Sequence, residues 1–155
     1  MRVLITGHQG YIGCHAVDVF QRAGHFVTGI DIGYFSDCTF EKRPCADSEI
    51  ITDVANLSIK DVAGHDAVVH LAAISNDPMG ELDEELTYRT NVAATVHLAK
   101  ICKAAHVPRF LFSSSCAVYG DSHGKYADES FGTAPQTAYA RSKVAAEQHL
   151  LELTD

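Results

Sequence analysis

Three residues in the last third of the 155-residue chain could do acid–base chemistry together. Tyr139 and Lys143 are four positions apart, so they share one face if their segment is helical. A free tyrosine has a pKa of about 10 and is a poor base at neutral pH, but a nearby ammonium favours its phenolate form. Ser115 ends a run of strand-forming residues, where its hydroxyl could hydrogen-bond a substrate alcohol while Tyr139 takes the proton. A Tyr/Lys pair at this spacing is common by chance, and the preceding Ser115 is what supports a catalytic interpretation of the pair.

A glycine-rich segment near the N-terminus could hold a dinucleotide. Gly7, Gly10 and Gly13 follow the β-forming run 2–6 and open an apolar, periodic segment. The first glycine permits a sharp turn, the second leaves room for a pyrophosphate, and the third lets the helix pack closely on the strand. A helix start also offers unpaired N–H groups and a partial positive charge to phosphates. Strand, glycine turn and helix together predict a nucleotide site.

Asp31 follows the second expected strand, 26–31, and would lie at its carboxyl end, where doubly wound sheets bind ligands. A carboxylate there accepts hydrogen bonds from an adenosine ribose and repels a 2′-phosphate, so it favours NAD over NADP. The alternative is a solvated acid at a strand end.

The elements that must position these residues alternate along the chain. We expect strands at 2–6, 26–31, 49–52, 66–73 and 109–115, helices at 12–23, 83–105 and 138–153, and a short helix or turn at 57–62. Segments 33–48 and 74–80 are expected as loops, and a long loop follows the fifth strand. Asn91 falls inside the 83–105 helix, where it either presents its amide or is merely tolerated. This alternation predicts an α/β fold with a Rossmann-like, doubly wound parallel sheet.

The composition is that of one soluble globular domain spanning residues 1–155, with 46% hydrophobic and 21% charged residues. The net charge of −8 argues against a nucleic-acid or anionic-membrane partner. The sequence shows neither a membrane-spanning run nor a signal peptide. Five cysteines without a Cys-x-x-Cys pair favour reduced thiols in the cytoplasm, and the nine histidines show no metal-ligand spacing.

These motifs resemble the extended short-chain dehydrogenase/reductase family, in particular its nucleotide-sugar epimerase/dehydratase branch, typified by UDP-glucose 4-epimerase. The matching segments appear in family order along the whole chain. They are Thr6-Gly7-His8-Gln9-Gly10-Tyr11-Ile12-Gly13, Asp31, Asp53-Val54, His70-Leu71-Ala72-Ala73, Asn91-Val92, Ser113-Ser114-Ser115-Cys116-Ala117-Val118-Tyr119-Gly120 and Tyr139-Ala140-Arg141-Ser142-Lys143.

The resemblance implies NAD as the cofactor and a nucleotide sugar, UDP- or dTDP-linked, as the substrate. The implied cofactor-binding residues are Gly7, Gly10, Tyr11, Ile12, Gly13, Asp31, Asp53, Val54, Leu71, Ala72, Ala73, Asn91, Ser113, Tyr139 and Lys143. The implied catalytic residues are Ser115, Tyr139, Lys143 and Asn91. In this scheme Tyr139 is the base, Lys143 tunes it and holds the nicotinamide ribose, and Asn91 supports the site from its helix.

The chain departs from the family pattern at three positions. The 4,6-dehydratases of this branch carry an acid pair after the catalytic threonine, whereas this chain has Cys116 and Ala117. Neither side chain protonates a leaving hydroxyl as a carboxylic acid would, which argues against 4,6-dehydration and, at the second position, against decarboxylation. Ser75 stands where some epimerases have a lysine, which weakens an assignment to UDP-galactose chemistry.

Members of this branch are roughly twice as long, so the resemblance predicts that the last strands of the sheet and the substrate domain are missing from these 155 residues. It also suggests a homodimer through the two long helices. Three readings stay open: an epimerase-like oxidoreductase, a non-catalytic NAD-binding module, and an NAD-dependent sugar dehydratase or reductase.

Overall fold

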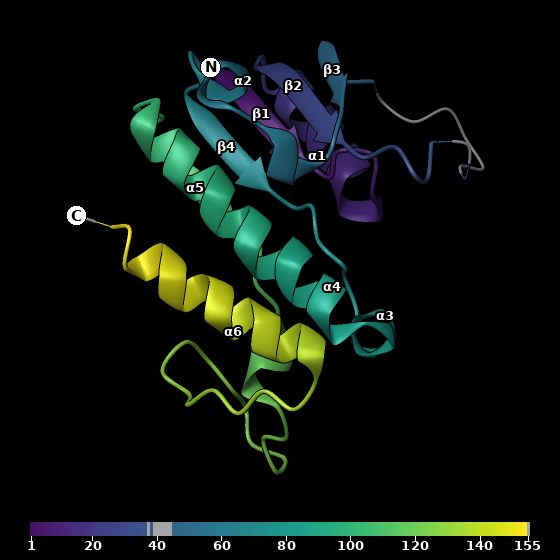
Figure 1. Cartoon of the computed structure of the whole chain (residues 1–155), viewed down its shortest axis with the longest axis vertical. Helices are drawn as coiled ribbons and strands as arrows, with labels where there is room; N and C mark the ends of the chain where they lie inside the picture. The colour runs from purple at the N-terminus through teal and green to yellow at the C-terminus, as the bar shows by residue number, and fades with distance from the viewer. Residues whose placement is uncertain (37, 39–44, 155) are drawn as a thin grey trace. The chain divides into compact units, whose positions relative to one another are not determined.

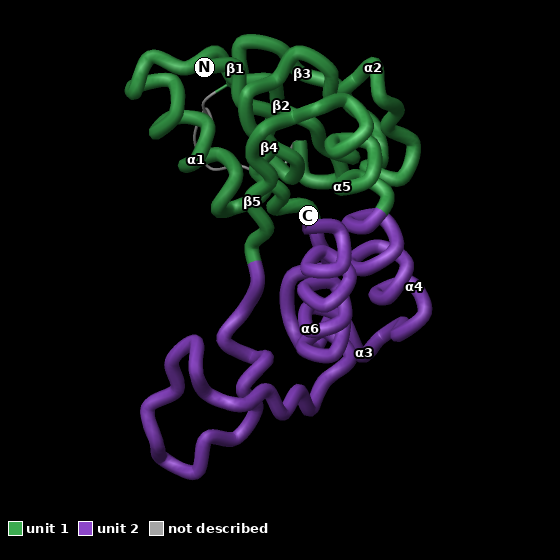
Figure 2. Tube along the Cα trace, turned by 90° about the vertical axis from the view of Figure 1, so that its left-hand side faces the viewer, with its two compact units in different colours: residues 1–72, 97–113 green, residues 73–96, 114–155 purple. Residues whose placement is uncertain are grey.

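The computed structural model describes residues 1–36, 38 and 45–154 (Figure 1), so part of the loop expected at 33–48 lies outside the described residues. The chain divides into two compact units, shown in green and purple in Figure 2. Unit 1 comprises Met1–Ala72 and His97–Ser113, and unit 2 comprises Ala73–Val96 and Ser114–Asp155.

Unit 1 is built on a parallel sheet of five strands in the order β3-β2-β1-β4-β5. The strands are β1 (Arg2–Thr6), β2 (Phe26–Asp31), β3 (Ser48–Ile51), β4 (Ala67–His70) and β5 (Phe110–Phe112). The central strand β1 pairs with β2 on one side and β4 on the other (Figure 1), and its Val3, Leu4 and Ile5 are fully buried. This order confirms the Rossmann-like, doubly wound sheet, whose ligands bind where the strand order reverses.

The helices of unit 1 begin and end close to their expected bounds. Helix α1 (Tyr11–Arg22) packs Val17 against Val3, Ile5 and Val27, and Gly24 follows it with a φ of +78°. The segment expected at 57–62 forms the 3₁₀ turn η1 (Val54–Asn56) and the helix α2 (Ile59–Val62). The Asp61 carboxylate accepts hydrogen bonds from both the N–H and the hydroxyl of Ser58, so this second helix starts only after Ser58.

Two strands are shorter than the apolar runs that predicted them. The run 66–73 pairs only as far as His70, and the run 109–115 pairs only over Phe110–Phe112. Beyond these points the backbone makes single hydrogen bonds, from Leu71 N to Thr6 O (3.1 Å) and from Ser113 N to His70 O (3.3 Å). Strand-forming residues therefore continue past the end of the ladder without extending it.

Unit 2 contains the helices α3 (Asp77–Leu82), α4 (Glu84–Tyr88) and α6 (Ala138–Leu151), the π-helical segment η2 (Arg89–Ala93) and the 3₁₀ turn η3 (Cys116–Tyr119). Helix α5 (Ala94–Ala104) continues from η2 into unit 1. Within unit 2, α6 packs against α3, α4, η2 and η3. Among the described residues, no helix has the length and apolar character needed to cross a bilayer.

One expectation for this region was wrong. The segment 74–80 was expected as a loop, but α3 begins inside it, because the Asn76 side chain accepts a hydrogen bond from Met79 N and Pro78 occupies a first-turn position that needs no N–H donor. The helix expected at 83–105 is present from Glu84 to Ala104, as α4, η2 and α5 in succession. Asp83 caps α4 by accepting from Leu86 N (2.8 Å), and the π-helical η2 then interrupts the α-helical pattern before α5.

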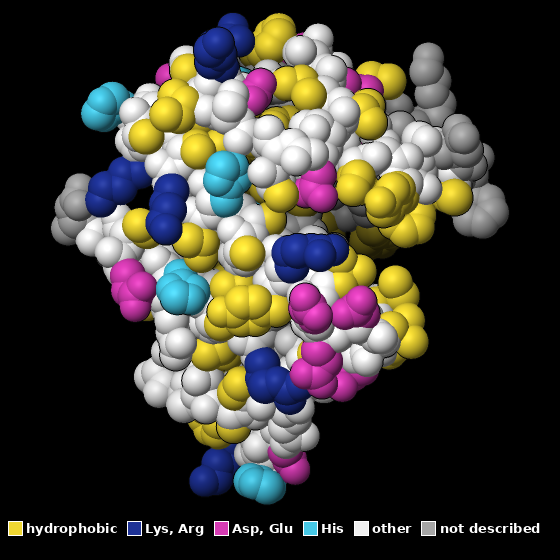
Figure 3. Space-filling view, viewed as in Figure 1, with side chains coloured by type: hydrophobic (Ala, Val, Ile, Leu, Met, Phe, Trp, Pro, Cys, Tyr) yellow, Lys and Arg dark blue, Asp and Glu magenta, His cyan; other side chains and the backbone are white. Residues whose placement is uncertain are grey.

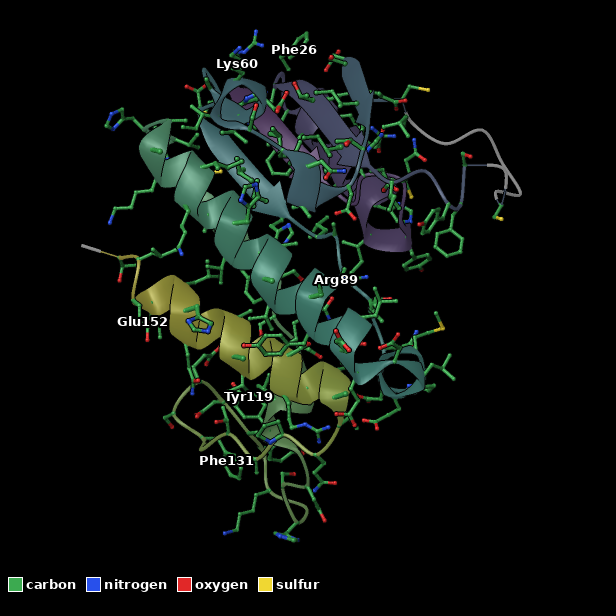
Figure 4. The ribbon with its side chains drawn as sticks, in the orientation of Figure 1. Phe26, Lys60, Arg89, Tyr119, Phe131 and Glu152 are labelled. Atoms are coloured by element: carbon green, nitrogen blue, oxygen red, sulfur yellow. The ribbon has the colours of Figure 1, made fainter. Side chains whose placement is uncertain are left out.

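The long loop before α6 is held by its own contacts. Ala134 N donates to Val118 O (2.9 Å), and the rings of Tyr119 and Phe131 meet edge to face with centroids 6.1 Å apart (Figure 4). The loop is thus fastened to η3, the turn that begins after Ser115.

Candidate functional site

The glycine turn of unit 1 closes on itself in a way that only glycine permits. Gly7 has a φ of +71°, and a Cβ on it would lie 2.7 Å from Ala72 N. A Cβ on Gly13 would lie 2.7 Å from the Cα of His8, so the start of α1 packs directly on the turn. For Gly10 the only described atom near such a Cβ is Gly7 O, at 3.3 Å, so its side of the turn stays open for a ligand.

The start of α1 fits a diphosphate. Gly10 is the N-cap and has no side chain to occupy the first N–H groups, and residues 11–14 include no acidic side chain. Tyr11 and Ile12, with exposures of 86% and 61%, contribute backbone at this point and keep their side chains in solvent. The helix start thus presents N–H groups and its partial positive charge to an anion. These residues could hold the phosphates of a dinucleotide.

Asp31 is fixed at the carboxyl end of β2 by its own loop. One carboxylate oxygen accepts from Gln9 N (3.0 Å) and the other from Gly33 N (2.9 Å). Each oxygen retains a further lone pair, so the group remains able to accept from ribose hydroxyls. The same carboxylate therefore orders the glycine turn and still has lone pairs free to accept hydrogen bonds from a ligand.

Asp53 and Val54 follow β3. The Asp53 side chain accepts from Ala55 N (2.9 Å) and so caps η1, while Val54 is buried. This cap fixes the position of both residues at the carboxyl edge of the sheet.

A hydrogen bond between two strand ends, which our sequence analysis did not predict, holds the residues after β4. Thr6 Oγ1 and His70 Nδ1 are 2.6 Å apart in a buried pair, and Ala72 N donates to the same hydroxyl (3.3 Å). Leu71 and Ala72 are thereby kept beside Gly7. Thr6 and His70 each end a buried, apolar strand, which is the signal that could have pointed to them.

In unit 2, Tyr139 and Lys143 are both buried on α6, with exposures of 8% and 5%. The Lys143 Nζ lies 5.8 Å from the centroid of the Tyr139 ring. Burial lowers the pKa of Lys143 to about 8, and the carboxylate of Glu147, one turn further along, acts in the opposite direction. The predicted pair is therefore a real contact in which the ammonium is poorly hydrated.

Asn91 presents its amide to three partners, which decides between the two alternatives left open by the sequence. Its Oδ1 accepts from Ile74 N (2.8 Å), and its Nδ2 donates to Ile74 O (3.0 Å) and to Ser142 Oγ (3.0 Å). Ser142 Oγ in turn donates to the Tyr139 carbonyl (2.7 Å). A chain of hydrogen bonds thus runs from η2 to the backbone of Tyr139.

The start of α6 is held by α3, which sequence reasoning missed because it assigned most of that segment to a loop. Thr137 Oγ1 donates to Asp77 Oδ1 and accepts from Ala140 N, and Glu81 Oε1 accepts from Ala138 N (2.6 Å). A Cβ on Gly80 would lie 3.0 Å from the Cβ of Tyr139, so the two helices touch at the tyrosine. Figure 3 shows the acidic side chains gathered over α3 and α4.

Ser115 is the N-cap of η3, and its Oγ accepts from Ala117 N (3.2 Å). Because η3 packs against α6, the serine and the Tyr/Lys pair belong to neighbouring elements of unit 2. The expected site residues divide between the units. Unit 1 holds Gly7, Gly10, Tyr11, Ile12, Gly13, Asp31, Asp53, Val54, Leu71, Ala72 and Ser113, and unit 2 holds Ala73, Asn91, Ser115, Tyr139 and Lys143.

The sheet order and the glycine turn define a dinucleotide-binding domain of the Rossmann-like class. The model of the NAD dependent epimerase/dehydratase family matches residues 3–155, and the chain belongs to this family. The family's enzymes use NAD as their cofactor.

Individual relatives are similar along nearly the whole chain. It is 34% identical to UDP-glucose 4-epimerase of Corynebacterium glutamicum over 150 residues, which cover 94% of this chain and 44% of that protein. It is 31% identical to dTDP-glucose 4,6-dehydratase of Streptomyces niveus over 159 residues, 95% of this chain and 47% of that protein. The structure of MoeE5 in complex with UDP-glucose and NAD is similar with a TM-score of 0.86 and 30% identity, over 98% of this chain and 48% of that one. The chain spans about half the length of these relatives.

Proposed function

We propose that the chain is the cofactor-binding and proton-transferring part of an NAD-dependent nucleotide-sugar epimerase-like oxidoreductase. The observation that carries this proposal is the Tyr139–Lys143 pair, in which a buried ammonium lies 5.8 Å from the centre of a buried tyrosine ring on the same helix. A buried ammonium this close to the ring is the arrangement expected of a tyrosine that acts as a general base.

In this mechanism the chain's own residues position a sugar hydroxyl and move its proton. Ser115 Oγ hydrogen-bonds the hydroxyl, and Tyr139 Oη removes its proton as the general base. Lys143 is assigned to stabilise the tyrosine oxygen before it takes the proton, and Asn91 holds the helix through Ser142 and the Tyr139 carbonyl. NAD, when bound, supplies the hydride acceptor.

The side chains after Ser115 favour epimerisation or reduction over dehydration. Cys116 is exposed and Ala117 has no proton to donate, so neither provides the carboxylic acid that elimination of a hydroxyl needs. Oxidation at a carbon followed by reduction requires no such acid. The substrate class that we propose is a UDP- or dTDP-linked sugar, because relatives carry these nucleotides in their names.

The test compares the chain with its Tyr139→Phe variant. Calorimetric titration should show NAD binding by both, within about threefold of each other, because the phenol oxygen is assigned to catalysis. Turnover of a panel of UDP- and dTDP-sugars is monitored by NADH absorbance and by product analysis. The chain should show turnover, and the variant should lose it by at least a hundredfold.

Equal loss of binding and turnover would exclude the proposed role of Tyr139. NAD binding without turnover of any sugar would instead favour a non-catalytic module, and net NADH formation or consumption would favour a dehydrogenase or reductase.

We also propose a homodimer through the long helices. On α6 and α4 the apolar side chains of Leu151 and Tyr88 are 69% and 52% exposed. Sedimentation equilibrium of the chain and of a Tyr88→Glu variant tests this, and a monomer at all concentrations would rule it out.

A further inference from the structure

The glycine turn contains polar side chains that are buried without hydrogen bonds. Among the described residues, the buried side-chain nitrogens and oxygens that lack a hydrogen-bond partner are both ring nitrogens of His8 and the Oε1 of Gln9. The His8 side chain is 1% exposed. Buried polar atoms are normally paired, so an imidazole kept in this position calls for an explanation.

The His8 ring occupies a gap that β2 leaves open for it. A Cβ on Gly29 would lie 2.5 Å from Cγ and 2.8 Å from Nδ1 of the His8 ring, so no other residue type fits opposite this ring. The Nε2 lies 3.2 Å from Glu49 Oε1 on β3, which is ion-pair distance without hydrogen-bond geometry. The backbone of His8 packs on α1 at Gly13. His8 therefore contacts β2 and β3 with its ring and α1 with its backbone.

We propose that His8 is a positioning residue for the cofactor turn: its ring, inserted opposite Gly29, holds residues 7–10 in the conformation that receives the diphosphate. The proposal rests on NAD binding by this turn. Gly7 and Gly10 contribute no side chains, and glycine-rich backbone loses much conformational entropy on ordering. A buried ring between them supplies an anchor that the glycines lack. His8 does not touch the cofactor.

The experiment compares His8→Ala, Gly29→Ala and the His8→Ala/Gly29→Ala double variant with the unchanged chain. The first readout, made without ligand, is hydrogen exchange of the Gly10 amide, which donates to Gly7 O (3.0 Å), relative to the Ile5 amide in the core strand β1. The second readout is the NAD dissociation constant by calorimetry. His15→Ala on the exposed face of α1 and Gly132→Ala, where a Cβ meets nothing within 4 Å, are the matched controls.

We expect each single variant to speed Gly10 exchange at least tenfold relative to Ile5 and to weaken NAD binding about tenfold. In the double variant the new Cβ enters the space left by the ring, so Gly29→Ala should add no further loss once His8 is gone. The controls should change neither readout.

Two results would overturn the proposal. In one, Gly29→Ala has the same effect with and without His8. In the other, Gly10 and Ile5 exchange faster by the same factor, which marks a general loss of stability with no specific effect on the turn. If the unchanged chain fails to bind NAD, the proposed function of the turn in this chain fails, while the exchange comparison still decides whether His8 orders it.

Discussion

At the scale of single residues, the buried ammonium of Lys143 links protonation to folding. Its pKa falls from the ordinary 10.5 to about 8, mainly because burial disfavours the charged form. Between these two values the unfolded chain binds more protons than the folded chain, so this group makes the free energy of unfolding rise as the pH increases from about 8 to 10.5.

The corresponding prediction concerns Lys143→Met, which keeps the length of the side chain and removes its charge. Urea unfolding of both proteins from pH 7 to 10.5 should show the unchanged chain gaining up to about 3 kcal/mol relative to the variant. Groups that titrate in this range and lie away from Lys143 are shared by both proteins, so their contributions cancel in the difference. A difference that stays constant with pH would contradict the assignment of a charge-disfavouring site to Lys143.

Asp31 gives a second prediction at this scale, on cofactor choice. Asp31→Asn keeps an oxygen that accepts from one of the two backbone N–H groups, Gln9 or Gly33, but removes the charge that repels a 2′-phosphate. We expect the ratio of NAD to NADP affinity to fall about tenfold, mostly through a gain for NADP. Calorimetric titration of both cofactors measures this ratio, with Asp18→Asn on α1 as the control that should leave it unchanged. An unaltered ratio in the Asp31 variant would mean that selectivity lies elsewhere.

At the scale of elements, Asn91 joins η2 to the segment after β4 and to α6. Asn91→Ala removes three hydrogen bonds and leaves the partly buried N–H and carbonyl of Ile74 without these partners. We expect a loss of about 2 to 4 kcal/mol in the free energy of unfolding, measured with urea. Arg89→Ala, an exposed position on the same π-helical segment (Figure 4), should cost less than about 0.5 kcal/mol. Equal losses in the two variants would show that helix propensity, and not the amide network, sets the stability of η2.

The same elements show what could be predicted from the sequence. The strands of the parallel sheet were predictable because most are short, largely apolar runs bounded by turn residues, and the glycine spacing identified the turn. In β3 only Ile50 and Ile51 show this pattern. The π-helical η2 was not predictable, because its Asn91 bonds to partners distant in sequence, Ile74 and Ser142. Asn76-Asp77-Pro78 is compatible with both a turn and a helix start, and only the cap from Asn76 to Met79 decides for the helix. The proposed role of His8 could not be predicted, because it depends on the space that Gly29, a residue without a side chain, leaves in β2.

At the scale of the whole molecule, a chain with a net charge of −8 binds an anionic cofactor only if local donors overcome the overall repulsion. In unit 1 these donors are the N–H groups at the start of α1, next to Gly10. Raising the salt concentration screens the long-range repulsion more than these short-range contacts. A diphosphate site made of backbone N–H groups at the start of α1 is therefore compatible with the negative net charge of the chain.

We expect these 155 residues to suffice for binding of the adenosine diphosphate part of the cofactor. The family resemblance assigns the glycine turn to the pyrophosphate, Asp31 to the adenosine ribose and Asp53-Val54 to the adenine, and all of these residues lie in unit 1. ADP-ribose, which lacks nicotinamide, should therefore bind within about tenfold of NAD in calorimetric titrations. Gly10→Val should weaken the binding of both ligands by at least a hundredfold, because the valine side chain would fill the open side of the turn. If ADP-ribose fails to bind while NAD binds, the nicotinamide contacts assigned to Tyr139 and Lys143 dominate the affinity. If neither ligand binds, formation of the cofactor site needs sequence that the longer relatives have and these 155 residues lack.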